Sequence, residues 1–261
     1  MEFTFISGAT GGLGKAFAEN LKAKGAPLFL IGRNQSKLSA LVEEMKKDND
    51  QPVMSFVCDL TDENSRRSLI EYIDSEGIKF NRIVNVAGVD IQKPFMDYTE
   101  EKLLFQLRVN VEATVSLTYA LLKRRAEKTE VLTVSSMSGV SPMPYFAVYS
   151  ATKALLINLF TSLHYELKGE GVKVTVILPG GIPTRPDIIA QIKEQGLWGK
   201  LSAKSPSFVA EKSLRAVRKN KTTYIPGFFN RFLNFLMKLA PKKIVLAFIA
   251  KRWKSQTKDA F

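Results

Sequence analysis

The sequence is poor in the residues on which several classes of protein depend. Its 261 residues include one cysteine, Cys58, and one histidine, His164. A single cysteine excludes an intramolecular disulfide framework and is typical of a reducing compartment. A single histidine excludes metal sites built from several histidines, and no metal site is predicted. No apolar run reaches the roughly 18 residues of a membrane-spanning helix, so a spanning segment is not expected.

Acidic residues are scarce at one end of the chain. Residues 228–261 contain eight Lys and Arg against one acid, Asp259, and hold much of the formal net charge of +13. At the other end, MEFTFISGA runs directly into a glycine-rich turn, which predicts no N-terminal targeting segment and a cytoplasmic protein. The composition, 45% hydrophobic and 24% charged, is ordinary for a folded domain.

Short apolar runs alternate along the chain with segments of helical periodicity. Alternation of this kind predicts an α/β fold with a doubly wound parallel sheet flanked by helices. We expect one domain over residues 1–227 and a basic amphipathic helical tail over residues 228–261. The expected strands are Phe3–Ser7, Leu28–Ile31, Val53–Val57, Ile83–Val86, Val131–Ser135, Val172–Leu178 and Thr223–Ile225. The expected helices are Leu13–Lys24, Gln35–Lys47, Glu63–Ser75, Glu100–Ala126, Tyr149–Leu167 and Ser207–Lys219.

The first strand leads into a glycine-rich segment, SGATGGLG, that spans Ser7 to Gly14 and opens the first helix. Glycines there allow a sharp turn and a close approach of the backbone to a pyrophosphate at the helix N-terminus. The fourth strand closes with Asn85-Val86-Ala87-Gly88, where small residues let the backbone lie close to an adenosine ribose. Together these segments predict a dinucleotide cofactor, although a glycine-rich turn can also be a plain connector.

The second strand, PLFLIGRN, ends without the acid that would bind a ribose 2′-hydroxyl. Arg33 stands there instead and would suit a 2′-phosphate, so NADP(H) is preferred and NAD(H) is the alternative. A second interpretation is that Arg33 only begins a solvated helix. After the third strand, Asp59 is expected to accept a hydrogen bond from the adenine amino group, and Asp62 could equally cap the next helix.

A phenol, an ammonium and a hydroxyl recur at defined intervals between Val134 and Leu156. Tyr149 and Lys153 are four residues apart on an expected helix, so they lie on the same side of it. Ser136 precedes Tyr149 by thirteen residues and follows a buried strand, EVLTVSS. Ligands collect at strand ends in open α/β sheets, so the three groups are expected to converge on one cleft. A chance Tyr-x3-Lys pair is the alternative.

These segments together resemble the classical short-chain dehydrogenase/reductase family. The resemblance is carried by SGATGGLG, CDL, NVAG, LRVNVEAT, the Ser136, Tyr149 and Lys153 spacing, and PGGIPT at Pro179–Thr184. It covers residues 3–184 strongly and the remainder weakly. Two positions depart from the family pattern, since Ser7 stands where Thr is usual and Val86 stands where a second Asn is common. The resemblance implies a Rossmann-type sheet of seven strands.

The resemblance also implies a catalytic tetrad of Asn110, Ser136, Tyr149 and Lys153. Tyr149 would donate a proton to the developing alkoxide, which requires its pKa to fall by about three units. Lys153 would supply positive charge for this, and the oxidised nicotinamide would add more in the alcohol-oxidising direction. Ser136 would hold the carbonyl oxygen, and Asn110 would anchor a water relay to solvent. The implied cofactor contacts are Ser7, Gly8, Thr10, Gly12, Leu13, Gly14, Arg33, Asp59, Leu60, Asn85, Ala87, Gly88, Tyr149, Lys153, Pro179, Gly180, Ile182 and Thr184. The expected substrate contacts are Ser138, Tyr145 and Ile188.

The region after Thr184 corresponds to a substrate lid in this family, expected near residues 185–205. Its apolar residues, among them Ile188, Ile192 and Trp198, suggest a lipophilic carbonyl substrate of the 3-oxoacyl, steroid or retinoid type. Packing of these residues on the sheet is the alternative. The predicted activity is therefore NADP(H)-dependent interconversion of a lipophilic ketone and its secondary alcohol. A nucleotide-sensing protein without turnover and a membrane-surface scaffold are the rival functions.

The tail mixes Phe, Leu and Ile with cations around Pro241, which predicts two short amphipathic helices. Such helices suit a membrane surface, where residues 228–258 would make peripheral contact. They could equally form a subunit interface, in a homodimer or homotetramer, or close the substrate pocket. Nucleic acid is not an expected partner, because the cations accompany bulky aliphatic residues and no nucleic-acid motif is present.

Overall fold

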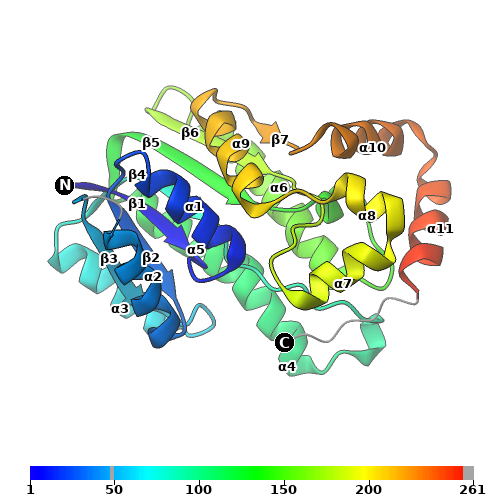
Figure 1. The fold of residues 1–261 in the computed structure, drawn as a ribbon, viewed down its shortest axis with the longest axis horizontal. Coiled ribbons are helices and arrows are strands. Elements are labelled where there is room, and N and C mark those ends of the chain that lie inside the picture. The colour runs from blue at the N-terminus through cyan, green and yellow to red at the C-terminus, as the bar shows by residue number, and fades with distance from the viewer. Residues whose placement is uncertain (48–49, 255–261) are drawn as a thin grey trace.

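The centre of the molecule is one sheet of seven parallel strands in the order β3-β2-β1-β4-β5-β6-β7 (Figure 1). The structure is a computed structural model that describes residues 1–47 and 50–254. The order reverses beside β1, as a doubly wound sheet requires, so the predicted Rossmann-type fold is confirmed. The strands are β1 (Glu2–Ser7), β2 (Leu28–Gly32), β3 (Val53–Val57), β4 (Lys79–Asn85), β5 (Arg125–Val134), β6 (Val172–Ile177) and β7 (Thr223–Tyr224).

Helices cover both faces of the sheet. Because side chains alternate along a strand, neighbours on β1 enter different cores, with Ile6 in one and Phe5 in the other. The first core is closed by α1 (Gly12–Lys22), α2 (Gln35–Lys46) and α9 (Pro206–Arg218). The second is closed by α3 (Glu63–Ser75), α5 (Ala113–Leu122) and α6 (Ala147–Glu166). The strands are therefore apolar on both faces, as parallel strands in α/β proteins usually are.

The predicted helix Glu100–Ala126 is too long and is not continuous. The chain forms α4 (Glu100–Leu107), a π turn η2 (Arg108–Glu112) and α5, and then enters β5 at Arg125. Arg125 pairs with Phe80 of β4, and Ala126 is buried. Strand pairing thus overrides the helix propensity of this charged segment. π turns often occur at functional sites, and η2 carries Asn110.

Four further helices lie beyond the carboxyl ends of the strands, away from the N-terminus (Figure 1). After β6 come α7 (Pro186–Glu194) and α8 (Gly196–Ser202), and after β7 come α10 (Phe228–Leu239) and α11 (Lys242–Trp253). Pro241 separates the last two, which agrees with the predicted pair of short helices around it. The short helical turns η1 (Phe95–Asp97) and η3 (Met137–Gly139) complete the elements.

Candidate active site

One cavity of about 640 Å³ lies along the carboxyl ends of the strands. The glycine-rich loop and Arg33 line one part of it, and Ser136, Tyr149 and Lys153 line another. Residues of α7, α10 and α11 line the rest. The cavity therefore joins the predicted cofactor loop, the predicted catalytic groups and the tail.

The glycine loop leaves the start of α1 open to this cavity. Gly8 has a φ of +63°, and a Cβ there would come within 2.9 Å of the Ala87 backbone. Gly11 caps α1 without any side-chain hydrogen bond, and the first turn of α1 contains no acid. Neither the cap nor the first turn of α1 thus supplies an anion that would compete for the N–H groups and the positive end of the helix dipole. This arrangement fits a pyrophosphate.

Two of the predicted cofactor contacts are not among the described residues that line the cavity. The Ser7 hydroxyl accepts hydrogen bonds from the backbone N–H groups of Val86 (3.1 Å) and Ala87 (3.3 Å). The Asn85 amide donates to the hydroxyls of Thr118 (2.9 Å) and Thr133 (3.1 Å). Both side chains are buried. The hydrogen bonds of Ser7 and Asn85 join neighbouring segments of the chain beneath the cavity wall and so help to fix the position of that wall.

The groups expected around an adenosine lie at the cavity wall. Arg33 follows β2 directly, and Asn34 rather than Arg33 caps α2 by accepting from the Lys37 N–H. Asp62 caps α3, which leaves Asp59 at the cavity, where its carboxylate accepts from the Thr61 N–H at 2.8 Å. The other predicted cofactor contacts at the cavity wall are Gly8, Thr10, Gly12, Leu13, Gly14, Leu60, Ala87, Gly88, Pro179, Gly180, Ile182 and Thr184.

The structure brings Ser136, Tyr149 and Lys153 together. The Ser136 hydroxyl hydrogen-bonds the Tyr149 phenol, and the Lys153 ammonium lies 5.6 Å from the centroid of the Tyr149 ring. Lys153 is buried and donates to the Val134 carbonyl at 3.1 Å. The neighbouring serine, Ser135, points away and donates to the Lys153 carbonyl oxygen. Ser138 lines the cavity.

The expected low pKa of Tyr149 is not found in the protein chain alone. Burial raises the pKa of the phenol above its usual value, and the negative charge of Asp90 raises it further. The Ser136 hydrogen bond and the Arg185 charge oppose this rise without cancelling it. Burial lowers the pKa of Lys153 to about 8. In the chain without a nicotinamide, the loss of water around the phenol outweighs the charges that favour the phenolate. A lowered pKa of Tyr149 therefore stays a prediction for the cofactor-bound protein.

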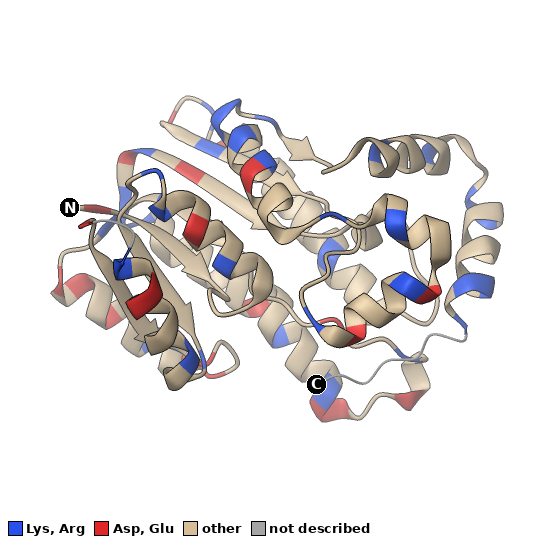
Figure 2. Cartoon of the chain, viewed as in Figure 1, with Lys and Arg blue, Asp and Glu red and all other residues tan. Residues whose placement is uncertain are grey.

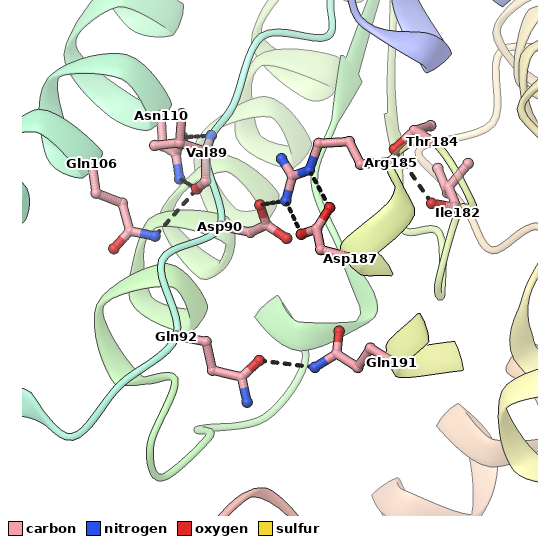
Figure 3. Close-up of polar contacts among 10 residues, drawn as sticks. All are labelled: Val89, Asp90, Gln92, Gln106, Asn110, Ile182, Thr184, Arg185, Asp187 and Gln191. Carbon is pink, nitrogen blue, oxygen red and sulfur yellow. Dashed lines mark hydrogen bonds and ion pairs between the residues drawn. The ribbon is translucent and has the colours of Figure 1, made fainter. Parts of the chain in front are cut away.

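Asn110 lies behind the cavity, where its amide is fully engaged. The Asn110 carbonyl oxygen accepts from the Val89 N–H at 2.7 Å, and its NH₂ donates to the Val89 carbonyl at 2.9 Å (Figure 3). The same NH₂ donates to the Thr152 hydroxyl at 3.1 Å. A Cβ on Gly88 would lie 3.2 Å from the Lys153 ammonium and 3.4 Å from the Asn110 oxygen. Asn110 therefore fixes the segment that faces Lys153. The water relay stays a prediction.

Two polar links connect the segment after β4 to α7 and its N-cap, and neither was predicted (Figure 3). The Arg185 guanidinium contacts the Asp90 carboxylate at 2.8 Å and the Asp187 carboxylate at 3.2 Å. Gln191 donates to the Gln92 side chain at 3.2 Å. Asp90 and Arg185 are 95 residues apart and Gln92 and Gln191 are 99 apart, and no spacing rule connects such distant positions. The charges of Asp90 and Arg185 act in opposite directions on the pKa of Tyr149.

The remaining wall is largely apolar and includes tail residues that the sequence did not single out. Ile188 and Ile192 of α7 line it, as expected for the lid region, whereas Tyr145 is not among its described lining residues. Trp253 stacks on Phe146 at 5.8 Å between ring centroids, and Phe146 stacks on Tyr149 at 4.4 Å. The tail thus forms part of the cavity wall. The other tail residues that line the cavity are Asn230, Leu233, Met237, Phe248, Ile249 and Arg252.

Comparison with known proteins defines the class. Residues 2–194 match the family model of the short chain dehydrogenases. The chain therefore belongs to the short-chain dehydrogenase family, as its motifs predicted, and is an oxidoreductase of that family. Solved structures with this fold contain NADP, NADPH or NAD. A nicotinamide cofactor accordingly fits the glycine loop and its unobstructed helix end.

Three similar proteins illustrate the range of relatives. An uncharacterized oxidoreductase of Staphylococcus epidermidis is 29% identical over 69% of this chain and 77% of its own length. A very-long-chain 3-oxoacyl-CoA reductase of Bos taurus is 30% identical over 77% of this chain, but over only 64% of its own length. A structure solved to explain the stereoselectivity of 7β-hydroxysteroid dehydrogenase has a TM-score of 0.86 at 24% identity, covering 95% of this chain and 96% of that chain.

Proposed function

We propose that this protein is an NADP(H)-dependent oxidoreductase that interconverts a lipophilic ketone and its secondary alcohol. The observation that carries the proposal is the position of Ser136, Tyr149 and Lys153 on one cavity wall, between the glycine loop and an apolar region. Two of the relatives described above are named for 3-oxoacyl-CoA and hydroxysteroid substrates, which are lipophilic. Their names support the substrate class for this chain.

The proton in the reaction is assigned to the Tyr149 hydroxyl. Because its pKa is raised, the phenol is protonated at neutral pH and can donate to a carbonyl oxygen. The Ser136 hydroxyl, which contacts the phenol in the absence of substrate, turns to donate to the same carbonyl oxygen and orients it. Lys153 provides positive charge near the phenolate that remains. A bound nicotinamide supplies the hydride in reduction and accepts it in oxidation.

Arg33 supports the choice of NADP(H). It lies at the cavity wall directly after β2, and no carboxylate follows that strand to bind a 2′-hydroxyl. A guanidinium binds a phosphate through charged hydrogen bonds, each of which contributes about 1.5–3 kcal/mol. The proposed order of preference is therefore NADPH over NADH.

A screen of ketones and alcohols with both cofactors tests the proposal. We expect NADPH-dependent reduction of long-chain or polycyclic ketones and weak activity on acetone. Arg33→Ala is expected to raise the KM for NADPH roughly 10- to 100-fold and to leave the KM for NADH unchanged, because one charged hydrogen-bonding group is lost. Initial rates followed by the absorbance of the reduced cofactor give both constants.

The matched control for this experiment is Lys24→Ala, which removes an exposed cation just beyond α1. It is expected to leave both KM values unchanged. A wild-type preference for NADH, or an Arg33→Ala variant with the wild-type KM for NADPH, would contradict the assignment of the cofactor.

Peripheral membrane contact is proposed for the outer face of the tail. Phe228, Phe232, Phe235 and Leu239 of α10 are exposed, and α10 and α11 carry Lys and Arg but no acid (Figure 2). Apolar side chains interspersed with cations suit an anionic bilayer surface. Within the described residues, no helix is both long and apolar enough to cross a membrane.

Vesicle binding tests this contact. The double variant Phe232→Asp/Phe235→Asp is expected to bind phosphatidylserine-containing vesicles roughly tenfold or more weakly, because two exposed apolar anchors are lost. Sedimentation with the vesicles measures binding, and vesicles of phosphatidylcholine alone are the control for charge. Wild-type protein that does not bind phosphatidylserine vesicles, or binding unchanged in the variant, would rule the contact out.

We propose that α4, α5 and α6 form the interface of a homodimer. These helices expose several large apolar side chains on the described surface, namely Leu104, Leu107, Tyr119 and Leu155. Leu155 of α6 is 41% exposed. A second copy of the chain would bury this surface.

A further inference from the structure

Three arginines are among the described residues that line the cavity, and their surroundings differ. Arg33 lies at the end of the cavity that the glycine loop lines. Arg185 is already paired with the carboxylates of Asp90 and Asp187. Arg252 is at the tail end of the cavity, and no acid within the described part of the chain forms an ion pair with it.

Arg252 is held in place from two sides. Its guanidinium lies 5.8 Å from the centroid of the Trp198 ring in α8, a distance at which a cation–π contact is favourable. The next residue, Trp253, stacks on Phe146, which in turn stacks on Tyr149. Two aromatic ring-to-ring steps, 5.8 Å and 4.4 Å, therefore lead from the residue beside Arg252 to the phenol.

Many of the residues that line the cavity outside the glycine loop are apolar. They come from α7, α10, α11 and the segment before α6, namely Met143, Ile188, Ile192, Leu233, Met237 and Ile249. Met143, Met237 and Ile249 pack in one cluster with Tyr149 and Trp253. A cation at the edge of an apolar surface loses part of its hydration, and an anion that hydrogen-bonds to it restores that loss. Among the described residues no Asp or Glu forms an ion pair with Arg252, and residues 228–254 themselves contain no acid.

We propose that Arg252 binds an anionic group at the end of the substrate remote from the carbonyl. The ligand is then an amphiphile with three parts: a ketone or alcohol at Tyr149, an apolar body, and a carboxylate or phosphate at Arg252. This inference rests on the proposed function and specifies its substrate class. Carboxylate and phosphate are the partners that the planar guanidinium fork binds best.

The surrounding charge favours such a ligand. Lys251 and Arg252 both lie in the last turn of α11, where cations also interact favourably with the helix dipole. In Figure 2, α10 and α11 show basic residues and no acidic ones. A cavity mouth lined by one sign of charge raises the local concentration of ligands of the opposite sign.

Ligand binding can be measured without turnover, because both tryptophans of the chain flank Arg252. Tryptophan fluorescence is titrated with laurate, dodecyl phosphate and dodecanol, which share one apolar chain and differ in the head group. We expect wild-type protein to bind one or both anions at least tenfold more tightly than dodecanol. Arg252→Met is expected to weaken anion binding roughly 10- to 100-fold and to leave dodecanol binding unchanged, because one charged hydrogen-bonding group is lost.

Two further variants separate charge from packing. Arg252→Lys keeps the cation over Trp198, so its anion affinity should lie between those of the wild type and Arg252→Met. Lys251→Met removes an exposed neighbouring cation that is not among the cavity-lining residues and should bind all three ligands as the wild type does. The comparison of laurate with dodecyl phosphate shows which anion the site selects.

Kinetics with matched ketones distinguish this inference from the proposed function. Oxo fatty acids and their methyl esters are compared as substrates, and Arg252→Met is expected to raise the KM of the acids while leaving that of the esters unchanged. Equal wild-type affinity for anions and dodecanol, or an equal effect of Arg252→Met on acids and esters, would overturn the role of Arg252. If wild-type protein reduces neither acids nor esters but still prefers the anions in the fluorescence titration, the proposed function fails and the anion site stands.

Discussion

Tyr149→Phe is expected to lower kcat for ketone reduction by roughly 10²- to 10⁴-fold, which is the usual contribution of a positioned general acid. The variant removes one hydroxyl and keeps the ring that stacks on Phe146, so the cavity should keep its shape. The affinity for NADPH, measured by the fluorescence of the reduced cofactor, is expected to change little. Initial rates at saturating ketone give the effect on kcat.

The matched control is Tyr165→Phe, the same change on the same helix. Tyr165 is 66% exposed and is not among the described residues that line the cavity, so its removal should leave kcat unchanged. If Tyr149→Phe keeps the wild-type rate, the proton comes from elsewhere and the mechanism is wrong. If wild-type protein binds NADPH and turns over no ketone or alcohol, the nucleotide-sensing alternative is favoured instead.

Lys153→Met is expected to abolish most activity and to stabilise the fold at pH 7. Lys153 is 3% exposed, and burial lowers its pKa from 10.5 to about 8. A shift of that size corresponds to about 3 kcal/mol of lost stability at pH values below the folded-state pKa. Methionine removes this cost but also loses the hydrogen bond to Val134, so a net gain of roughly 1–3 kcal/mol in the free energy of unfolding is expected.

The sign of the effect can be checked with pH. Between about pH 8 and pH 10.5 the unfolded chain holds the Lys153 proton and the folded chain does not. Unfolding therefore takes up a proton in this range, and the free energy of unfolding of the wild type rises with pH. The stability advantage of Lys153→Met over the wild type should therefore shrink as the pH rises from 8 to 10.5. Urea unfolding of both proteins at pH 7 and at pH 10 measures this difference in the free energy of unfolding. The exposed Lys168→Met is the control, and a Lys153→Met variant less stable than wild type at pH 7 would contradict the argument.

The positions that the sequence predicted well share a physical basis. Strands, cap residues and the glycine loop depend on local chemistry, which is why β3 and α3 have the predicted bounds. Tyr149 and Lys153 meet because one helical turn separates them, and Ser136 joins them because β5 ends there. Each of these contacts follows from secondary structure and from the shared edge of a parallel sheet.

The positions that were missed depend on tertiary packing. Ser7 and Asn85 lie in the right segments, but their side chains bond neighbouring strands and helices instead of facing the cavity. The raised pKa of Tyr149 required knowledge of burial and of Asp90, whose partner Arg185 is far away in sequence. The face of the tail that lines the cavity could not be predicted, because it depends on how α10 and α11 pack against the rest of the chain.

The tail has a consequence for the order in which the protein matures during synthesis. The glycine loop, the six longer strands and the tyrosine helix all precede residue 228 in the chain. A ribosome therefore releases the whole sheet before it releases α10 and α11, which supply Met237, Ile249 and Trp253 to the cavity wall. The residues of the glycine loop can therefore fold while the apolar part of the cavity is still open to water, and the cavity wall is completed only when α10 and α11 dock.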